Sequence, residues 1–226
     1  MYHHTHNLKL LEEAPRELHV ELGLNRERVR DIIEEYLADG KPVVLSEFVS
    51  KEILENYGIP VNKTVVATSP EEAASVARKL GFPVVLKVYS PDITHKTEAG
   101  GVVLNLASEQ EVIAAYRSIV QNARRYKPDA EILGVTVQGM VKEQGYEVIL
   151  GSKQDPIFGP VILFGMGGIM TEIIRDRAIA LPPLNSTLAR RLMEETKVYK
   201  LLKGFRNRPP VNLGLLEEIL IRFSHL

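Results

Sequence analysis

The sequence predicts a mixed α+β fold organised in two lobes, and three observations lead to this prediction. Residues 63–127 alternate short β-branched runs with two amphipathic segments, in the order strand, helix, strand, strand, helix. Residues 131–181 are instead rich in Val and Ile and predict several strands in succession. Two amphipathic helices then follow, so each lobe can bury the apolar face of a sheet against helices.

We divide the chain into three parts on this basis. Residues 1–25 show no clear hydrophobic period and predict an irregular N-terminal tail. Residues 26–130 would hold the N-terminal helices and the first lobe, and residues 131–226 the second lobe. The boundary is expected near 128–131, where a Lys-Pro-Asp sequence ends a helical pattern.

Capping residues mark the helices of the first lobe. Ser69 precedes Pro70, with Glu72 three residues after the cap, and Ser108 stands three residues before Glu111. In such capping boxes a hydroxyl and a carboxylate satisfy the free N–H groups of the first helical turn. Together with apolar spacing and glycine stops, these signals predict helices over 26–39, 47–57, 70–80 and 109–126, and strands over 64–67, 84–89 and 102–106.

The second lobe begins with strands and ends with helices. Gln144-Gly145 is a candidate turn between its first two strands, and Gly165-Met166-Gly167-Gly168 follows the third. The predicted elements are strands over 132–140, 145–150 and 160–165, then helices over 186–203 and 213–225.

Composition excludes several functions. The 226 residues include no Cys, which rules out disulfides, thiol catalysis and cysteine metal sites. A net charge of -1 gives no large basic surface for nucleic acid, and no apolar run approaches the roughly 18 residues of a membrane span. The N-terminus does not resemble a signal peptide. His3, His4 and His6 could bind a metal, but nothing fixes their geometry, so we expect only a flexible tail in a cytoplasmic protein.

Lys87 is the first candidate for a phosphate-binding residue, because it stands near the end of an apolar strand. The polar loop that follows contains Lys96 and Gly100-Gly101. Ammonium groups pair with phosphate oxygens, and glycines let backbone N–H groups approach them closely. The arrangement predicts a nucleoside triphosphate site. Considered alone, Lys87 could be a strand residue whose head reaches water, and Gly100-Gly101 a hairpin turn.

His95 stands in the middle of this loop. A neutral imidazole nitrogen can attack a phosphoryl group, and the resulting N–P bond can pass that group on. No local cluster of Cys and His supports a metal site instead. The alternative is a loop histidine without a role.

Acidic residues and a second glycine pair offer weaker signals. Glu147 lies in an apolar strand, where it could contact a ribose or a metal, or simply face solvent. Glu172 and Asp176 follow Gly167-Gly168 at helical spacing and are typical of acids in a first helical turn. The glycine turn lacks both the Gly-x-x-x-x-Gly-Lys-Ser/Thr and the Gly-x-Gly-x-x-Gly pattern, so we reject a P-loop and a dinucleotide-binding fold.

The chain resembles the ATP-grasp family. More closely, it resembles the beta subunit, or the corresponding domain, of ADP-forming acyl-CoA synthetases (acetate–CoA ligase, ADP-forming), which are relatives of succinyl-CoA synthetase. The resemblance covers about residues 27–226, and His95-Lys96 before Gly100-Gly101-Val102 is its sharpest motif. The other matching segments are 45–48, 57–61, 81–87, 92–96, 155–160, 164–168 and 197–204.

This resemblance implies two α+β lobes with ATP held between their sheets. Lys87 matches the strand lysine that binds phosphates, and Lys96 would assist it. Glu147 matches an acidic position near the nucleotide. The connection that lies against adenine is matched by Gln138, Met140 and Val141.

The resemblance also implies a reaction, in which acyl-CoA, ADP and phosphate reversibly give carboxylic acid, ATP and CoA. His95 matches the histidine that accepts a phosphoryl group in relay. It would receive that group from a partner alpha subunit with CoA-binding and ligase domains, in a hetero-oligomer, and present it to ADP with Mg²⁺.

The family's magnesium ligands lie in an Asp-Ile-Asn-Pro strand and a later Asp, beyond a helix like 213–225. This sequence contains no such motif, so either it is incomplete there or its metal site is impaired, and we identify no metal ligand. Two alternatives stay open. One is another ATP-grasp ligase of the succinyl-CoA synthetase type, against which His95 argues. The other is a nucleotide-binding regulatory module without catalysis, which the missing acids favour.

Overall fold

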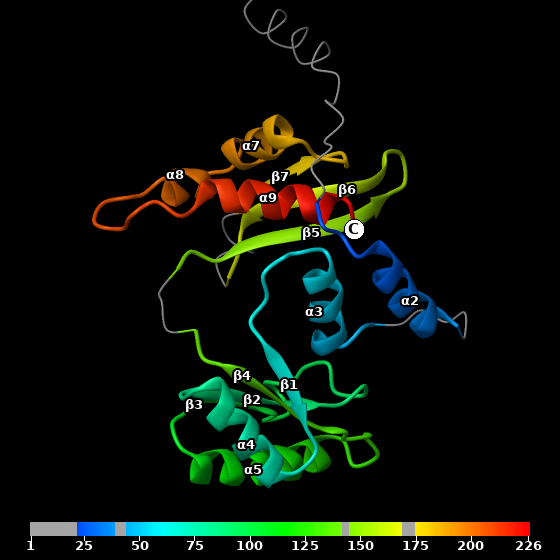
Figure 1. Ribbon diagram of the computed structural model, residues 1–226, viewed down its shortest axis with the longest axis vertical. Helices are drawn as coiled ribbons and strands as arrows, with labels where there is room; N and C mark the ends of the chain where they lie inside the picture. The colour runs from blue at the N-terminus through cyan, green and yellow to red at the C-terminus, as the bar shows by residue number, and fades with distance from the viewer. Residues whose placement is uncertain (1–21, 39–43, 142–144, 169–174) are drawn as a thin grey trace, which may run out of the picture. The chain divides into compact units, whose positions relative to one another are not determined.

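The computed structural model describes residues 22–38, 44–141, 145–168 and 175–226 (Figure 1). The chain forms two compact units. We call them the Lys87 unit, which comprises Glu27–Glu55 and Pro60–Glu143, and the Glu147 unit, which comprises Met1–Arg26, Asn56–Ile59 and Gln144–Leu226. Each unit combines helices with an antiparallel sheet, so the prediction of a mixed α+β fold is confirmed.

The Lys87 unit is built on a four-stranded antiparallel sheet. Its strands are β1 (Thr64–Ala67), β2 (Val84–Tyr89), β3 (Val102–Leu106) and β4 (Gly134–Gly139), in the spatial order β1-β4-β2-β3. Lys87 on β2 lies opposite Thr136 of β4 and Val102 of β3. It therefore stands inside the sheet, with a paired strand on either side.

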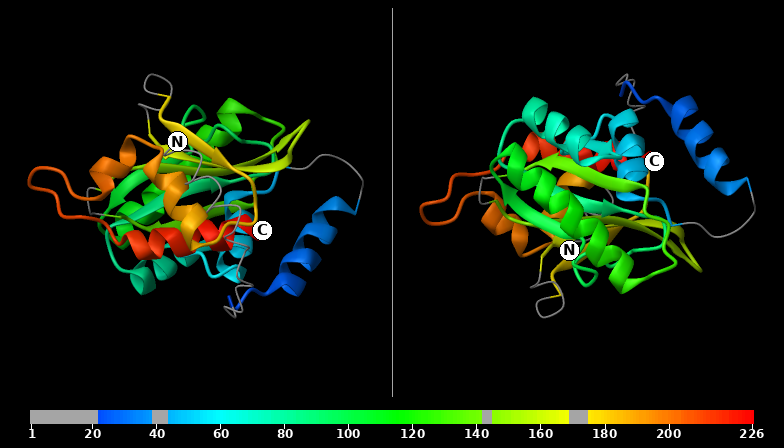
Figure 2. Two further views of the ribbon diagram at one scale, coloured as in Figure 1. Left: turned by 90° about the horizontal axis from the view of Figure 1, so that it is seen from above. Right: turned by 90° about the horizontal axis from the view of Figure 1, so that it is seen from below.

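Two helices, α4 (Pro70–Leu80) and α5 (Glu109–Tyr126), cover one face of this sheet (Figures 1 and 2). Both begin as predicted, because Ser69 Oγ and Ser108 Oγ each accept a hydrogen bond from the backbone N–H three residues later. Leu86 and Val88 are fully buried in the core with these helices. Since side chains alternate along a strand, Lys87 points to the opposite face.

That opposite face meets α3 (Glu47–Asn56), which follows α2 (Arg26–Leu37) in the chain. Ser46 Oγ accepts a hydrogen bond from Val49 N–H at 3.3 Å, so the predicted start of α3 is confirmed. The cap places Glu47 in the first helical turn, where its carboxylate reaches Lys87.

The position of β4 changes the expected division of the chain. The sequence places a strand over 132–140 in the second lobe, after a boundary near 128–131. In the structure β4 lies between β1 and β2, and the change of unit falls at 143–144. Val135 and Val137 are fully buried against the helices of the Lys87 unit, so β4 is needed to close that core.

The Glu147 unit has a three-stranded antiparallel sheet. Its strands β5 (Val148–Asp155), β6 (Gly159–Met166) and β7 (Arg177–Ala180) lie in sequence order. The helices α7 (Ser186–Glu194), α8 (Val198–Leu202) and α9 (Leu213–Ser224) share an apolar core with this sheet, in which Phe164 and Leu220 are fully buried. The sequence did not predict β7, because its four residues include one β-branched side chain, whereas the equally short β1 includes three.

The helix predicted over 186–203 is in fact two helices, α7 and α8. Thr196 Oγ1 donates a hydrogen bond to the carbonyl of Met193 at 2.6 Å. The Asp176 carboxylate accepts hydrogen bonds from the N–H groups of Lys197 and Val198, each at 2.7 Å, and so starts a new helix. Asp176 is therefore a buried cap for α8 and not a first-turn acid after the glycine pair.

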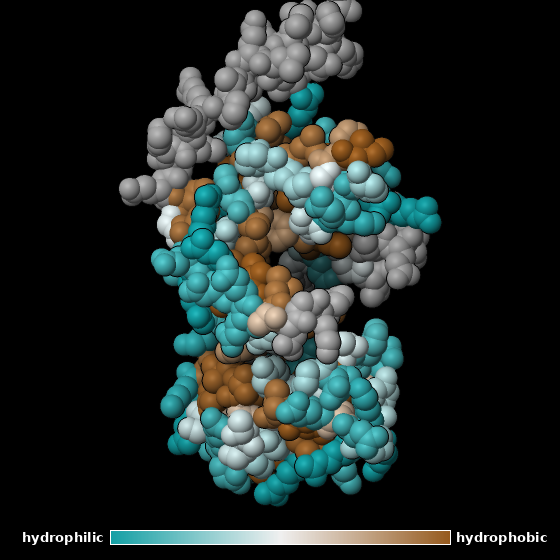
Figure 3. All heavy atoms as spheres, turned by 90° about the vertical axis from the view of Figure 1, so that its right-hand side faces the viewer, coloured by the Kyte–Doolittle hydropathy of each residue, from teal (hydrophilic) through white to brown (hydrophobic). Residues whose placement is uncertain are grey.

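Several predictions fall on residues that the structure does not describe, namely Gln144, Glu172, the three N-terminal histidines and most of the expected tail. Among the described residues, no helix is both long enough and apolar enough to span a bilayer. The face drawn in Figure 3 mixes hydrophobic with hydrophilic side chains.

Candidate phosphoryl-transfer site

Lys87, His95 and Lys96 line one cavity of about 470 Å³ in the Lys87 unit. Lys87 comes from β2, whereas His95 and Lys96 come from the connection 90–101 between β2 and β3. Two carboxylates, Glu47 and Glu98, also line the cavity. The structure thus brings together the three side chains for which the sequence predicts contact with phosphate.

Glu47 holds Lys87 in this cavity, and the sequence analysis assigned it no role. Lys87 Nζ donates to Glu47 Oε1 at 2.9 Å and to Oε2 at 3.1 Å. Gln138 Nε2 donates to the same Oε1 at 2.9 Å, and Lys51 Nζ lies 3.1 Å from it. The only signal in the sequence is an acid directly after the Ser46 cap, which many helices have for their dipole alone.

The Glu47 carboxylate is ionised at neutral pH. Burial by itself would raise the pKa of Glu47, but hydrogen bonds from Lys87, Gln138 and Lys51 outweigh burial and lower the pKa to about 2. The side chains of Lys87 and Glu47 are 25% and 29% exposed, so solvent screens the pair only in part.

The connection 90–101 is fastened at both ends. Near its start, Ile93 is buried and Asp92 Oδ2 accepts a hydrogen bond from Glu131 N–H at 2.7 Å, which lowers the pKa of Asp92. Near its end, Val88 N–H donates to the carbonyl of Gly101 at 2.7 Å. A side chain at Gly101 would come within 2.6 Å of Val88 Cγ1, so only glycine fits there.

The role expected for Gly100 and Gly101 as phosphate donors does not agree with this geometry. Gly100 N–H donates to the carbonyl of Thr97 at 3.0 Å, and Gly101 N–H donates to that of Lys96 at 2.8 Å. Both donors are used inside the connection. The glycines shape the turn that presents His95 and Lys96, and neither lines the cavity.

His95 itself is open to approach. Its side chain is 73% exposed, and Nδ1 lies 3.8 Å from Glu98 Oε1. An imidazole at this exposure can be reached by a phosphoryl donor on one occasion and by an acceptor on another, which is the chemical requirement of a relay.

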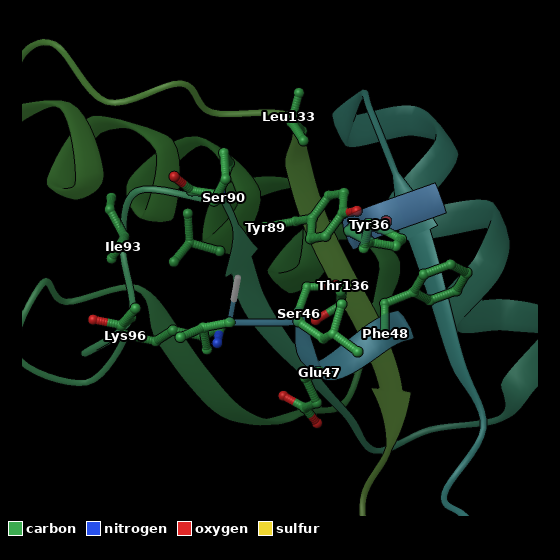
Figure 4. A pocket seen from close by; sticks show the side chains of 15 residues that line it. Tyr36, Ser46, Glu47, Phe48, Tyr89, Ser90, Ile93, Lys96, Leu133 and Thr136 are labelled. Atoms are coloured by element: carbon green, nitrogen blue, oxygen red, sulfur yellow. The ribbon is translucent and has the colours of Figure 1, made fainter. Parts of the chain in front are cut away.

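A second pocket of about 320 Å³ adjoins the first, and Glu47, Thr94 and Lys96 line both. Figure 4 shows the rings of Tyr36, Phe48 and Tyr89 on one side of this pocket and Lys96 on the other. The phosphoryl-transfer cavity therefore has a more apolar neighbour on the same face of the sheet.

The three residues expected to lie against adenine do not share one environment. Gln138 lies inside β4, is 4% exposed and donates to Glu47, so it belongs to the Lys87 network. Met140 and Val141 follow β4. Met140 N–H donates to the carbonyl of Pro83 at 3.0 Å, and the Val141 side chain is exposed.

Glu147 lies beside the Gly167-Gly168 turn within its own unit. Gly167 N–H donates to the carbonyl of Glu147 at 2.8 Å. Gly168 has a φ of +72°, and a side chain at this position would collide with the Glu147 carboxylate. The glycines thus leave room for Glu147, an exposed acid just before β5.

The described residues contain no group of three or more His, Cys, Asp or Glu side chains placed to hold a metal ion. We therefore assign no magnesium ligand.

Comparisons with known proteins agree on one family. Residues 36–226 match the ATP-grasp domain model. The beta subunit of acetate–CoA ligase (ADP-forming) I from Pyrococcus furiosus is 43% identical over 199 residues, which cover 88% of this chain and 84% of that protein.

Solved structures agree as well. A complex of Candidatus Korarchaeum cryptofilum dinucleotide-forming acetyl-coenzyme A synthetase 1 with coenzyme A and Ca-AMPCP matches with a TM-score of 0.80 and 42% identity, covering 87% of this chain and 85% of that one. A second complex of that enzyme, with coenzyme A and Mg-AMPPCP, matches with a TM-score of 0.75 and 38% identity, over 87% of this chain and 84% of that one. Its phosphohistidine segment is described as pointing towards the nucleotide-binding site. With these identities over most of both chains, the chain belongs to the ATP-grasp family and, within it, to the beta subunits of ADP-forming acetate–CoA ligases.

Proposed function

We propose that this chain binds ADP and ATP through Lys87 and Lys96 and transfers a phosphoryl group between His95 and the nucleotide. The observation that carries the proposal is the single cavity lined by all three side chains. Two ammonium groups can neutralise phosphate oxygens there, while the exposed imidazole supplies the nucleophile. A phosphohistidine segment that points towards the nucleotide-binding site in the Korarchaeum relative supports a histidine relay as the class of reaction.

The transfer step consumes one proton besides phospho-His95 and ADP. The N–P bond of phospho-His95 breaks as a terminal phosphate oxygen of ADP forms a new P–O bond, and the departing ring nitrogen takes up a proton from solvent, which gives ATP and neutral imidazole. Lys87 and Lys96 bind the oxygens over which negative charge spreads in the transition state. Mg²⁺ would enter with the nucleotide, to which it binds mainly through phosphate oxygens, and would neutralise charge there.

The remaining parts of the proposal concern the base, the ribose and the partner. Met140 and Val141 would lie against adenine through their main chain, and Glu147 would contact the nucleotide. An alpha subunit with CoA-binding and ligase domains would form the acyl phosphate and phosphorylate His95. The net reaction would convert acyl-CoA, ADP and phosphate into carboxylic acid, ATP and CoA.

Replacing Lys87 with Ala tests nucleotide binding at this cavity. A charge-assisted hydrogen bond to phosphate contributes about 1.5–3 kcal/mol, so ADP affinity should fall by about 10- to 100-fold in calorimetric titrations. Lys79→Ala, which removes an exposed lysine from α4, is the matched control and should bind ADP like the native chain.

Unchanged ADP affinity in Lys87→Ala, with a native circular dichroism spectrum, would disprove the assignment of Lys87. A chain that binds ATP but never phosphorylates His95, even with an alpha subunit present, would instead be a nucleotide-binding regulatory module.

A further inference from the structure

We propose that Glu47 is a positioning residue that holds the Lys87 ammonium group aimed at the bound phosphate. The inference rests on the proposed function, because it concerns the same cavity. It adds a residue from α3, outside the sheet and the connection that hold the predicted phosphate ligands.

The number of donors on Lys87 is the first argument. An ammonium group has three N–H donors. The two oxygens of Glu47 accept from Lys87 Nζ at 2.9 and 3.1 Å, which leaves a further N–H for a phosphate oxygen in the cavity that both residues line. With its stem fixed in a central strand and its head fixed by two bonds, Lys87 is oriented before the nucleotide arrives.

The second argument is the charge around Lys87. Lys51 Nζ also contacts Glu47 Oε1, so the two ammonium groups face each other across one carboxylate oxygen. From the connection 90–101, Lys96 adds a third positive charge, and His95 and Glu98 complete the titratable groups that line the cavity. From β4 the facing side chains, Thr136 and Gln138, are neutral. Without Glu47, repulsion from the Lys51 and Lys96 ammonium groups would displace the Lys87 ammonium group from its present position.

The opposite role is also physically conceivable. Glu47 could merely occupy the place of a phosphate on Lys87, in which case its removal would strengthen nucleotide binding. The other contacts of Glu47 favour the positioning role. Glu47 Oε1 also accepts a hydrogen bond from Gln138 of β4 and contacts Lys51 of α3. These contacts can hold the carboxylate in place when a phosphate binds Lys87. The two roles predict opposite signs for one substitution.

Calorimetric titration of ADP into Glu47→Gln separates these roles. Loss of the carboxylate charge should weaken binding by about tenfold near neutral pH, equivalent to about 1.4 kcal/mol. Glu55→Gln makes the same change of charge at an exposed position of α3 and should behave like the native chain.

Glu47→Asp gives a second test, because it keeps the charge but withdraws it by one methylene group. Affinity should fall by only about threefold, through the altered position of Lys87, because the carboxylate is retained. If Glu47→Gln does not fold, native-like affinity in Glu47→Asp overturns the proposal.

The outcomes also distinguish this proposal from the proposed function. Unchanged or tighter ADP binding by Glu47→Gln overturns the positioning role, and so does a loss of affinity in Glu47→Asp as large as that in Glu47→Gln. If Lys87→Ala also binds ADP normally, the proposed nucleotide site itself fails. If Lys87→Ala loses affinity and Glu47→Gln does not, only the role of Glu47 is wrong.

Discussion

His95 and Lys96 are neighbours in sequence, yet their surroundings differ. His95 is 73% exposed and lines only the phosphoryl-transfer cavity, whereas Lys96 lines both this cavity and its more apolar neighbour. A phosphohistidine needs access to two partners in turn, and a phosphate-binding lysine needs a fixed place. The exposure of His95 meets the first of these needs.

Replacing His95 with Asn, which is similar in size but not nucleophilic, should leave ATP binding intact and abolish the phosphoenzyme. The native chain, incubated with γ-labelled ATP, should carry label that is lost in acid and kept in base, as expected for a phosphoramidate. His95→Ala should fail in the same way, whereas His225→Asn, a histidine at the end of α9, should retain the label. Near-native exchange between ATP and a phosphorylated alpha subunit in either His95 variant would make His95 an ordinary loop residue.

At the scale of elements, the contact between α3 and the sheet is partly electrostatic. Glu47 in the first turn of α3 accepts hydrogen bonds from side chains of β2 and β4. The link depends on a carboxylate whose pKa is about 2 in the folded chain, compared with about 4.5 without these partners. Because the folded pKa is the lower one, the contribution to stability is complete above the unfolded pKa and lost as pH falls towards the folded value.

Acid should therefore destabilise the native chain more than Glu47→Gln between about pH 5 and pH 2. The difference in the free energy of unfolding between the native and Glu47→Gln chains should shrink by on the order of 2 kcal/mol over this range, after discounting for the exposed part of the ion pair. Denaturant-induced unfolding at about pH 5 and at about pH 2 measures this free energy, with Glu55→Gln as the control. Parallel pH profiles for native and Glu47→Gln chains would show that the ion pair does not stabilise the fold.

At the scale of the molecule, the chain has two units, each with its own apolar core. The three predicted phosphoryl-transfer residues all belong to the Lys87 unit, while Glu147 and its glycine turn belong to the other. The relatives that match along most of their length are named beta subunits. These names imply a partner subunit.

The purified chain alone should not convert acyl-CoA, because the proposed phosphoryl donor to His95 is formed in an alpha subunit. Adding an alpha subunit from such a ligase should restore ATP formation from acyl-CoA, ADP and phosphate. A coupled assay of ATP measures this activity. The His95→Asn chain with the same alpha subunit is the control and should stay inactive. Robust turnover by this chain without any partner would contradict the division of labour.

Local patterns along the chain were enough to predict much of this protein. Ser69 with Glu72 and Ser108 with Glu111 start their helices as expected, because a cap acts on N–H groups within one turn. The placement of Lys87 in an apolar strand, and of His95 and Lys96 in the connection after it, also follows from neighbouring residues alone.

Tertiary structure decided what depends on residues far apart in the chain. Glu47 lies 40 residues from Lys87 and 91 from Gln138, and no periodicity links positions at such separations. Asp176 starts α8 from 21 residues away, and β4 enters the first sheet only because Val135 and Val137 complete its core. Local signals act through adjacent backbone groups, whereas these contacts exist only once packing has brought the strands and helices together.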